Sequence, residues 1–321
     1  MDIPVVDIAP FLSGDEPQRV AMAWDAAMRS TGFALIAGHG IGDGLLDGIY
    51  ARAQAFFARP AVEKARLTFP DKGRGQGYLP LRSEVVGRGR DAGARPDLCE
   101  SLTFADPRFD RAPPAGALEA ELYRANLWPD GMPGFRETVE AYMAAGRRLA
   151  LTLMRLSTVA LDLPEDYFAP FFDRMELNLR CVLYPGQAEA PQDGELRYGP
   201  HTDFAGFTIL RQDSAPGGLQ AQADGEWIDV PPVPGTLVIN AGDLIQRWTN
   251  DRWVSNVHRV VNPNSDVPLR DNARLSIVLF TGPNADATIA CLPGCGPAKY
   301  PPILAGEHAA ERMRQTYGPA I

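Results

Sequence analysis

The N-terminal third of the chain alternates short apolar runs with segments of helical periodicity. The runs Ile3–Ile8 and Phe33–Ala37 have the length and the residue content of β-strands. Pro17–Arg29 and Leu45–Phe57 place large apolar side chains three or four residues apart, which predicts two amphipathic helices. A glycine or a proline follows each of these helical segments within a few residues and provides a helix stop.

A longer helical pattern occupies the middle of the chain, and β-type patterns fill the second half. Gly134–Leu161 repeats apolar residues at helical intervals, which predicts a long helix packed on the core. From Glu176 onward, turn sequences such as Asp224-Gly225 and Pro234-Gly235 separate short apolar or alternating runs. The predicted strands are Leu177–Tyr184, Phe207–Gln212, Gly218–Gln222, Trp227–Val230, Thr236–Ala241, His258–Val261 and Arg274–Phe280. Successive strands without intervening helices indicate a mainly β fold with flanking helices: a sandwich, a barrel or a jelly roll.

Residues 70–96 differ from the segments on either side. They contain Gly73-Arg-Gly-Gln-Gly and Gly87-Arg-Gly-Arg but no apolar periodicity, which predicts long loops. The glycine spacing resembles a dinucleotide-binding turn. However, no buried strand precedes it and no helix follows it, so this pattern does not predict nucleotide binding.

Composition and charge exclude several classes of protein. The 321 residues are 45% hydrophobic and 22% charged, as in a soluble globular protein. A net charge of −9 argues against a general nucleic-acid-binding surface. No apolar stretch approaches the roughly 20 residues of a membrane span and no signal-peptide pattern opens the chain, so we expect a cytoplasmic protein. The cysteines complete no zinc motif, and we expect free thiols at Cys99, Cys181, Cys291 and Cys295.

Two histidines and an aspartate form the most informative pattern. His201-Thr202-Asp203 follows the residues Tyr198-Gly-Pro, and His258 opens a later predicted strand. On an extended chain, side chains two residues apart point to the same side, so His201 and Asp203 can bind one metal ion together. Two imidazoles and one carboxylate, with the other coordination positions open, suit non-haem Fe(II). The same three ligands with one open position also suit Zn²⁺, although no candidate general base stands near the motif.

A second pair at the same spacing lies downstream of the proposed ligands. Arg274-Leu275-Ser276 places a guanidinium and a hydroxyl on one face of a predicted strand. An arginine buried inside a barrel needs an anionic partner, because an unpaired buried charge is very costly. The distal carboxylate of a dicarboxylate ligand would provide that partner through two guanidinium hydrogen bonds and one hydroxyl bond.

Together these motifs resemble the isopenicillin N synthase-like branch of the Fe(II)- and 2-oxoglutarate-dependent dioxygenases. His201, Asp203 and His258 match the metal triad of that family, and Arg274 and Ser276 match its 2-oxoglutarate clamp. The stretches Gly32-Phe-Ala-Leu-Ile-Ala-Gly-His-Gly and Gly242-Asp-Leu-Ile-Gln-Arg-Trp agree as well. The resemblance extends from about residue 3 to residue 283 and keeps the motifs in the family's order.

The resemblance implies a fold, cofactors and a reaction. The fold is a double-stranded β-helix (jelly-roll) core with N-terminal and central helices, within one structural unit. Its expected segments are an α/β region at 1–110, a helical segment at 111–172, the jelly-roll core at 173–285 and a C-terminal tail and helix at 286–321. The implied cofactors are Fe(II), 2-oxoglutarate and O₂. A small organic substrate would be hydroxylated, desaturated or cyclised while 2-oxoglutarate is converted to succinate and CO₂. The pattern does not indicate the oligomeric state.

Several further positions are candidates for binding or structure. Tyr184 matches a tyrosine that helps to hold 2-oxoglutarate in relatives, although Val182 replaces the asparagine that many relatives have two residues earlier. The interval between His258 and Arg274 is long for the family and predicts an enlarged hairpin loop at Asn262–Asn272. The candidate substrate contacts are Arg82, Phe204, Phe207 and Trp248. His39 is expected to be structural, and His308 to be a solvated residue of a C-terminal helix.

Two other functions remain open from the sequence. An iron oxidase that does not use 2-oxoglutarate, like isopenicillin N synthase itself, would keep the same metal triad, and Arg274-x-Ser276 alone does not exclude it. A non-catalytic binding protein could use the same scaffold, but it would have no need of an open iron site. Succinate formation and metal content distinguish these alternatives.

Overall fold

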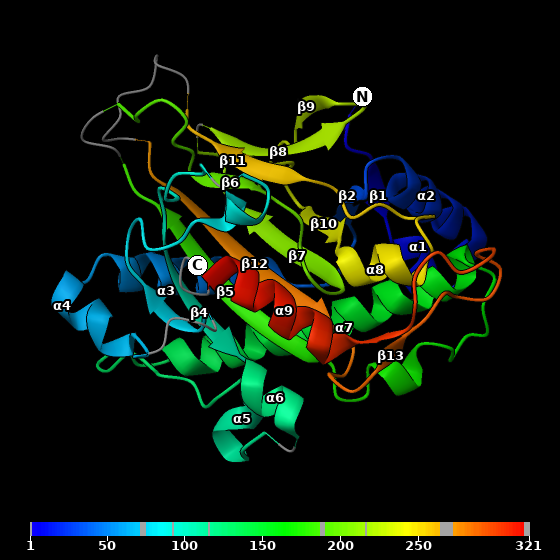
Figure 1. Ribbon diagram of the computed structural model, residues 1–321, viewed down its shortest axis with the longest axis horizontal. Helices are drawn as coiled ribbons and strands as arrows, with labels where there is room; N and C mark the ends of the chain where they lie inside the picture. The colour runs from blue at the N-terminus through cyan, green and yellow to red at the C-terminus, as the bar shows by residue number, and fades with distance from the viewer. Residues whose placement is uncertain are drawn as a thin grey trace.

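The computed structural model describes residues 2–70, 75–91, 93–114, 116–186, 190–215, 217–263 and 272–317. Two β-sheets form its centre, and helices pack against the larger one (Figure 1). The helices are α1 (Ala9–Ser13), α2 (Pro17–Ser30), α3 (Asp43–Phe57), α4 (Ala61–Lys64), α5 (Arg108–Arg111), α6 (Ala117–Leu122), α7 (Phe135–Ala160), α8 (Asp243–Trp248) and α9 (Ala305–Tyr317). The strands are β1 (Val5–Asp7), β2 (Phe33–Ala37), β3 (Gly77–Leu79), β4 (Glu100–Ala105), β5 (Glu176–Tyr184), β6 (Tyr198–His201), β7 (Phe207–Gln212), β8 (Gly218–Ala223), β9 (Glu226–Asp229), β10 (Leu237–Ala241), β11 (His258–Val261), β12 (Arg274–Gly282), β13 (Thr288–Ile289) and β14 (Ile303–Leu304).

The two sheets have the topology of a jelly roll. The larger sheet has the strand order β1-β2-β10-β7-β12-β5-β4-β3, and the smaller has the order β6-β11-β8-β9. Within both sheets the pairing is antiparallel except for β1 with β2. Strands that lie far apart in the sequence are therefore neighbours, and β12 runs between β7 and β5. This arrangement confirms the predicted mainly β, double-stranded β-helix fold.

The alternation of side chains along β12 separates two layers of the molecule. Leu275, Ile277 and Leu279 face the helical layer and belong to its large hydrophobic core. The intervening residues of β12 face the smaller sheet, where they line the space between the sheets. Helix α7 packs against β12 so closely that a Cβ atom at Gly146 would lie 2.1 Å from Leu279 Cδ2. A small residue at this position therefore lets the long helix lie flat on the sheet.

The predicted elements agree well with the observed ones. The helices and strands expected from periodicity are all present, with ends that differ by a few residues. The prediction that residues 70–96 form loops alone is wrong, because β3 pairs with β4 at the edge of the larger sheet and a 3₁₀ turn spans Val86–Gly89. Within the expected hairpin loop at Asn262–Asn272, residues 264–271 lie outside the described part of the chain.

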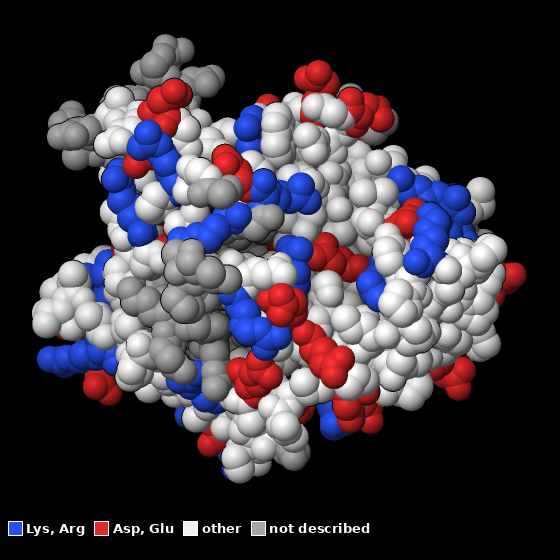
Figure 2. Space-filling view, in the orientation of Figure 1, with Lys and Arg blue, Asp and Glu red and all other residues white. Residues whose placement is uncertain are grey.

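The surface and the helices contribute two further observations. Figure 2 shows acidic and basic side chains interspersed on the face that carries α9. In the described part of the chain, no helix combines the length and the apolar character needed to cross a membrane.

Candidate active site

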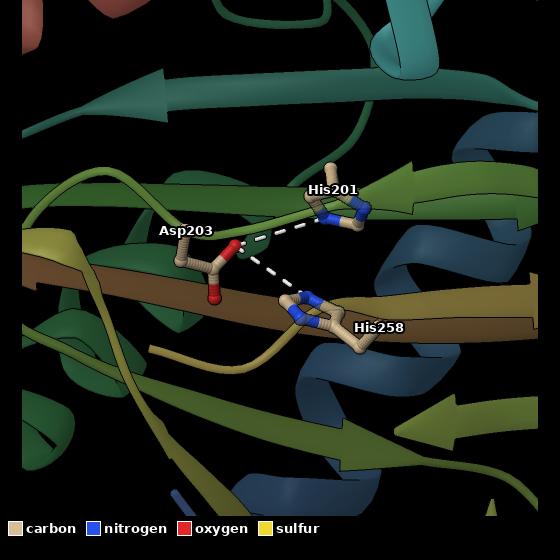
Figure 3. A group of neighbouring side chains, drawn as sticks. All are labelled: His201, Asp203 and His258. Atoms are coloured by element: carbon tan, nitrogen blue, oxygen red, sulfur yellow. Dashed lines mark ion pairs between the residues drawn. The ribbon is translucent and has the colours of Figure 1, made fainter. Parts of the chain in front are cut away.

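The smaller sheet brings the two histidines of the predicted triad together. His201 ends β6, His258 begins β11, and the two residues are partners in the antiparallel register of these strands. Asp203 follows β6 by two residues, and its carboxylate points toward both imidazoles (Figure 3). Asp203 Oδ1 lies 3.7 Å from His201 Nε2 and 3.6 Å from His258 Nε2. One potential ligand atom from each residue lies within 4.8 Å of the other two, a spacing that a single metal ion can bridge.

Hydrogen bonds behind the cluster fix the orientation of each ligand atom. His201 Nδ1 lies 2.9 Å from the carbonyl oxygen of Gly199, and His258 Nδ1 lies 3.0 Å from that of Asn256. A carbonyl only accepts, so each Nδ1 must carry the proton, and each Nε2 then presents its lone pair to the cluster. This donor arrangement is the one that histidine ligands use in metal sites.

The carboxylate of Asp203 is held in the same way. Thr208 Oγ1 and Asn240 Nδ2 donate to Asp203 Oδ2 at 2.5 Å and 2.6 Å, and Oδ1 is left facing the imidazoles. Burial and the neighbouring His258 lower the pKa of His201 to about 3. Burial alone would raise the pKa of Asp203, but the two imidazoles and the two hydrogen bonds outweigh it and lower the pKa. Two neutral imidazoles and one carboxylate are therefore preorganised, and this donor set fits Fe(II).

The Arg-x-Ser motif opens into the same cleft as the three potential ligands. Arg274 and Ser276 line a cavity between the sheets whose wall also includes His201, Asp203 and His258. The Arg274 side chain is only 2% exposed. Its Nη2 donates to Gln212 Oε1 at 2.7 Å, while the contacts of Nη1 with Asp213 and Ala215 are long, at 3.3–3.4 Å. Among the described residues no partner is found for Arg274 Nε. The guanidinium is thus positioned firmly by one strong bond and retains capacity for an anionic ligand.

Tyr184 lies beside this motif, as expected from the resemblance. It is the register partner of Arg274 across the β5–β12 pair, and it lines the same cleft. Val182, which departs from the family pattern, is the partner of Ser276 and lines the cleft too. The cleft wall contributed by β5 therefore combines a phenol with an apolar side chain in place of an amide.

A second cavity adjoins the cleft on the other side of the potential ligands. His201 and Asp203 line both spaces. The walls of the second cavity come from both sheets, from the segment after β6 and from α9, which crosses in front of the larger sheet in Figure 1. Phe204 lines this cavity, and the guanidinium carbon of Arg312 lies 4.8 Å from the centre of its ring. A small molecule in this cavity would contact the potential ligands and Phe204 directly.

The other three predicted substrate contacts, Phe207, Trp248 and Arg82, line neither of the two cavities. Phe207 is buried in the helical core, with its ring 5.1 Å from that of Trp24. Trp248 is buried against three phenylalanines of the 164–172 region. Arg82 is half exposed and forms an ion pair with Glu195 at 3.2 Å. Apolar packing holds Phe207 and Trp248 in the core, and an ion pair holds Arg82 at Glu195.

The two remaining histidines have different surroundings. His39 accepts a hydrogen bond from the Ile41 backbone N–H at 3.1 Å, which agrees with its expected structural role. His308 was expected to be solvated, but its side chain is only 19% exposed, and its Nε2 lies 3.8 Å from Asp243 Oδ2. The prediction for His308 is wrong because α9 packs across the cavity instead of standing in solvent.

Comparisons with known proteins agree with this geometry. Residues 175–283 match the model of the 2OG-Fe(II) oxygenase superfamily, and residues 3–131 match that of the "non-haem dioxygenase in morphine synthesis N-terminal" family. The "2-oxoglutarate-Fe(II) type oxidoreductase hxnY" of Emericella nidulans is 33% identical over 330 residues, which cover 99% of this chain and 91% of that protein. The chain belongs to the 2OG-Fe(II) oxygenase superfamily. The oxygenase is also 30% identical to "Homoarginine-6-hydroxylase 2-ODD-233" of Oryza sativa, over 97% of its own length and 96% of the relative.

Solved structures extend the likeness to the whole fold. The oxygenase superposes on a full-length Neurospora crassa protein, crystallised in complex with α-ketoglutarate, with a TM-score of 0.85 and 30% identity, over 97% of this chain and 95% of that one. The oxygenase is therefore a 2-oxoglutarate-dependent dioxygenase that uses Fe(II), 2-oxoglutarate and O₂ and oxidises a small organic molecule.

Several residues that shape the site escaped the sequence prediction. Thr208 and Asn240 orient the aspartate, and Gln212 and Asp213 position the arginine. Asn240 left a signal, because it is the only polar residue in the apolar run Leu237–Ala241 and is buried. The other three are ordinary strand or loop residues in the sequence, and only the tertiary structure reveals that they contact Asp203 or Arg274.

Proposed function

We propose that His201, Asp203 and His258 hold the Fe(II) of this oxygenase, and that Arg274 and Ser276 bind the distal carboxylate of 2-oxoglutarate. Tyr184 would lie alongside the co-substrate, because it faces the same cleft. The oriented Nε2 atoms and the free Asp203 Oδ1 support the assignment of the ligands. The observation that carries the proposal is the single cleft that joins a buried, incompletely satisfied guanidinium to the three potential ligands.

The bound metal supplies the redox chemistry with O₂ that converts 2-oxoglutarate to succinate and CO₂ and oxidises the substrate by two electrons. The protein's own residues bind and orient the reactants. Arg274 and Ser276 pair with the carboxylate at one end of the cleft, and Phe204 forms part of the wall against which the substrate lies. The product can be a hydroxylated, desaturated or cyclised molecule.

The nearest rival is an iron oxidase that does not use 2-oxoglutarate. Such an enzyme can use the same buried arginine for a carboxylate of its substrate, so the burial of Arg274 does not separate the two functions. The relatives favour the proposed one, because the 33% identical protein is a 2-oxoglutarate-Fe(II) type oxidoreductase and the Neurospora crassa protein was crystallised with α-ketoglutarate. A non-catalytic binding protein is disfavoured because hydrogen bonds constrain all three potential ligands, an arrangement that binding alone does not require.

Anaerobic titration of the purified protein tests the proposal. Adding Fe(II) and then 2-oxoglutarate should produce the weak visible charge-transfer band of the chelate, and Arg274→Ala should weaken it at a given 2-oxoglutarate concentration. Arg155→Ala on α7 removes an exposed guanidinium far from the cleft and should leave the band unchanged. No band in the wild-type protein, or an undiminished band in Arg274→Ala, contradicts the assignment. Succinate formed in step with substrate oxidation separates the proposed enzyme from the oxidase.

We also assign the chain to the isopenicillin N synthase-like branch and to the cytoplasm. The match of residues 3–131 to a dioxygenase N-terminal region supports the branch. The four cysteines are free thiols, with Cys99 and Cys181 buried, which supports a reducing compartment.

A further inference from the structure

Polar side chains alternate along one face of β5, where the strand lines the second cavity. Glu176, Asn178 and Arg180 all line it, whereas the intervening Leu177 and Leu179 belong to the hydrophobic core. A strand turns successive side chains to opposite faces, so the polar residues form a continuous row toward the cavity. The cavity therefore has a polar end, which lies away from the Tyr184 end of the strand and from the 2-oxoglutarate cleft.

Glu176 is the residue of this row with an unused polar atom. Its side chain is 10% exposed, and Arg108 Nη2 lies 3.3 Å from Oε1. Among the described residues Oε2 has no hydrogen-bond partner. Burial raises the pKa of Glu176 to about 7, although a hydrogen bond with the phenol of Tyr123, which also lines the cavity, and the charge of Arg108 act in the opposite direction. Buried polar atoms are nearly always satisfied, so the free Oε2 in a cavity points to a donor group on a ligand.

Arg108, the guanidinium that contacts Glu176, is shared with a second carboxylate. Arg108 reaches Glu176 from α5, outside the cavity lining, and its Nη2 also contacts Glu119 at 3.1 Å. Asp106, the other acid close enough to raise the pKa of Glu176, is paired with Arg147. Arg108 is therefore shared between Glu119 and Glu176.

Arg180, the arginine of this row, forms a buried ion pair within the protein. Arg180 Nη2 donates to Glu84 Oε2 at 2.5 Å, and both side chains are at most 5% exposed. Asp97, a second acid near this guanidinium, accepts backbone hydrogen bonds from Val86 and Gly199. A ligand anion would have to compete with this buried ion pair, so the cavity does not favour a carboxylate substrate.

The remaining walls combine apolar side chains with the hydroxyl groups of Thr103, Tyr123, Tyr198 and Thr281. Phe204, Phe280, Val86 and Met313 line the space between the potential metal ligands and the Glu176 end. Arg180 lines both cavities and lies four positions along β5 from Glu176, which corresponds to about 13 Å of extended strand. A ligand that spans this space has an apolar body with its polar terminus several bonds from the carbon that reacts.

We propose that the substrate of this oxygenase carries a basic nitrogen, as an amine or a guanidine, which Glu176 binds at the polar end of the second cavity. The inference rests on the proposed function, because it takes the triad as the reacting end of the same cavity. Glu176 Oε2 accepts from the cationic group, and Asn178 lies next to it in the polar row. The apolar walls then direct a C–H bond of the ligand toward His201 and Asp203.

Calorimetry with three matched ligands tests the charge preference. Hexylamine, 1-hexanol and hexanoate share one apolar chain and differ in the terminal group. Binding is measured anaerobically on the full-length protein with Fe(II) and 2-oxoglutarate, at pH 8, where Glu176 is ionised. We expect hexylamine to bind at least tenfold more tightly than hexanol, and hexanoate to bind more weakly than both.

Two variants assign the preference to the carboxylate. Glu176→Gln keeps the shape of the side chain and should remove the tenfold advantage of the amine while changing the affinity for hexanol less than threefold. Glu119→Gln is the matched control, because Glu119 contacts the same arginine but does not line the cavity, and it should retain the preference. Folding of each variant is verified by its thermal melt.

Four outcomes of these experiments would overturn the inference. These outcomes are equal binding of hexylamine and hexanol, tighter binding of hexanoate, no binding of any of the three at millimolar concentration, or an unchanged preference in Glu176→Gln. The wild-type comparison needs no variant and stands even if Glu176→Gln misfolds. The charge-transfer band of the 2-oxoglutarate complex is recorded in the same samples: its absence contradicts the proposed function, whereas its presence without an amine preference contradicts only the inference about the substrate.

Discussion

Replacing Arg274 should weaken the binding of 2-oxoglutarate by an amount that the structure allows to be estimated. The guanidinium is nearly inaccessible, and only its bond to Gln212, at 2.7 Å, is short. Removing one partner of a buried charge pair costs about 2–5 kcal/mol, mostly because the other charge stays buried and unpaired. Ser276 remains in the cleft in Arg274→Ala, so we expect the lower part of this range, about 2–3 kcal/mol. Such a loss corresponds to a Kd about 30- to 150-fold higher.

The dissociation constant is measured by anaerobic titration of the charge-transfer band with Fe(II) present. Arg274→Lys keeps the charge but loses the planar fork, and its Kd should fall between those of the wild type and Arg274→Ala. Asp213 loses a buried partner in Arg274→Ala, so the unliganded variant should also melt at a lower temperature. A Kd within threefold of the wild-type value in a folded Arg274→Ala protein would refute the reasoning.

Three further predictions concern the support of the site and the core. Asn240→Ala removes one of the two hydrogen bonds to Asp203 Oδ2 and should lower the affinity for Fe(II) or Co(II) about 10- to 100-fold, and an unchanged metal titration would count against it. Glu176→Gln should gain stability relative to the wild type as pH rises. The pKa of Glu176 is about 7 in the folded protein and 4.5 in the unfolded chain, so the wild type loses about 3 kcal/mol of folding free energy as pH rises from 4.5 to 7. The amide in Glu176→Gln does not titrate, so the variant keeps its stability over this range. Urea unfolding at pH 4.5 and pH 8 checks this, and a difference independent of pH contradicts it. Gly146→Ala should cost about 1–3 kcal/mol by overpacking α7 on β12. Gly44→Ala in α3, with open space around the new methyl group, should instead be neutral or stabilising, and equal unfolding curves for the two variants would contradict the packing argument.

An element could be predicted from the sequence when its own residues show a clear periodicity, and it was missed when it forms only by pairing with another strand. Helix α7 and strands β5, β7 and β12 are long and strongly patterned, so their periodicity alone revealed them. Strand β6 was missed because it is short and contains a glycine and a proline, and it becomes a strand by pairing with β11. Strand β3 was missed in a glycine-rich segment for a similar reason, since its partner β4 is remote from it in the sequence.

The same division holds within the active site. The spacing of two in His201-x-Asp203 and Arg274-x-Ser276 is a local property of an extended chain and could be read without a structure. The substrate contacts could not be read in this way. Phe204 and Phe207 are equally aromatic and three residues apart, yet one lines the cavity and the other packs against Trp24.

The sequence by itself determined the long helix and most of the longer strands, the metal-binding and Arg-x-Ser motifs, and through them the class of reaction. These features depend on residue type and short spacing, and such local properties do not require knowledge of the neighbours in space. Only the tertiary structure decided which polar groups orient Asp203 and Arg274, that α9 closes the second cavity, and that Glu176 lies at its polar end. Most of those relations join distant segments: Asn240 and Asp203 are 37 residues apart, and Arg312 and Thr202 are 110 apart. They arise from sheet pairing and packing, which no local pattern in the chain encodes.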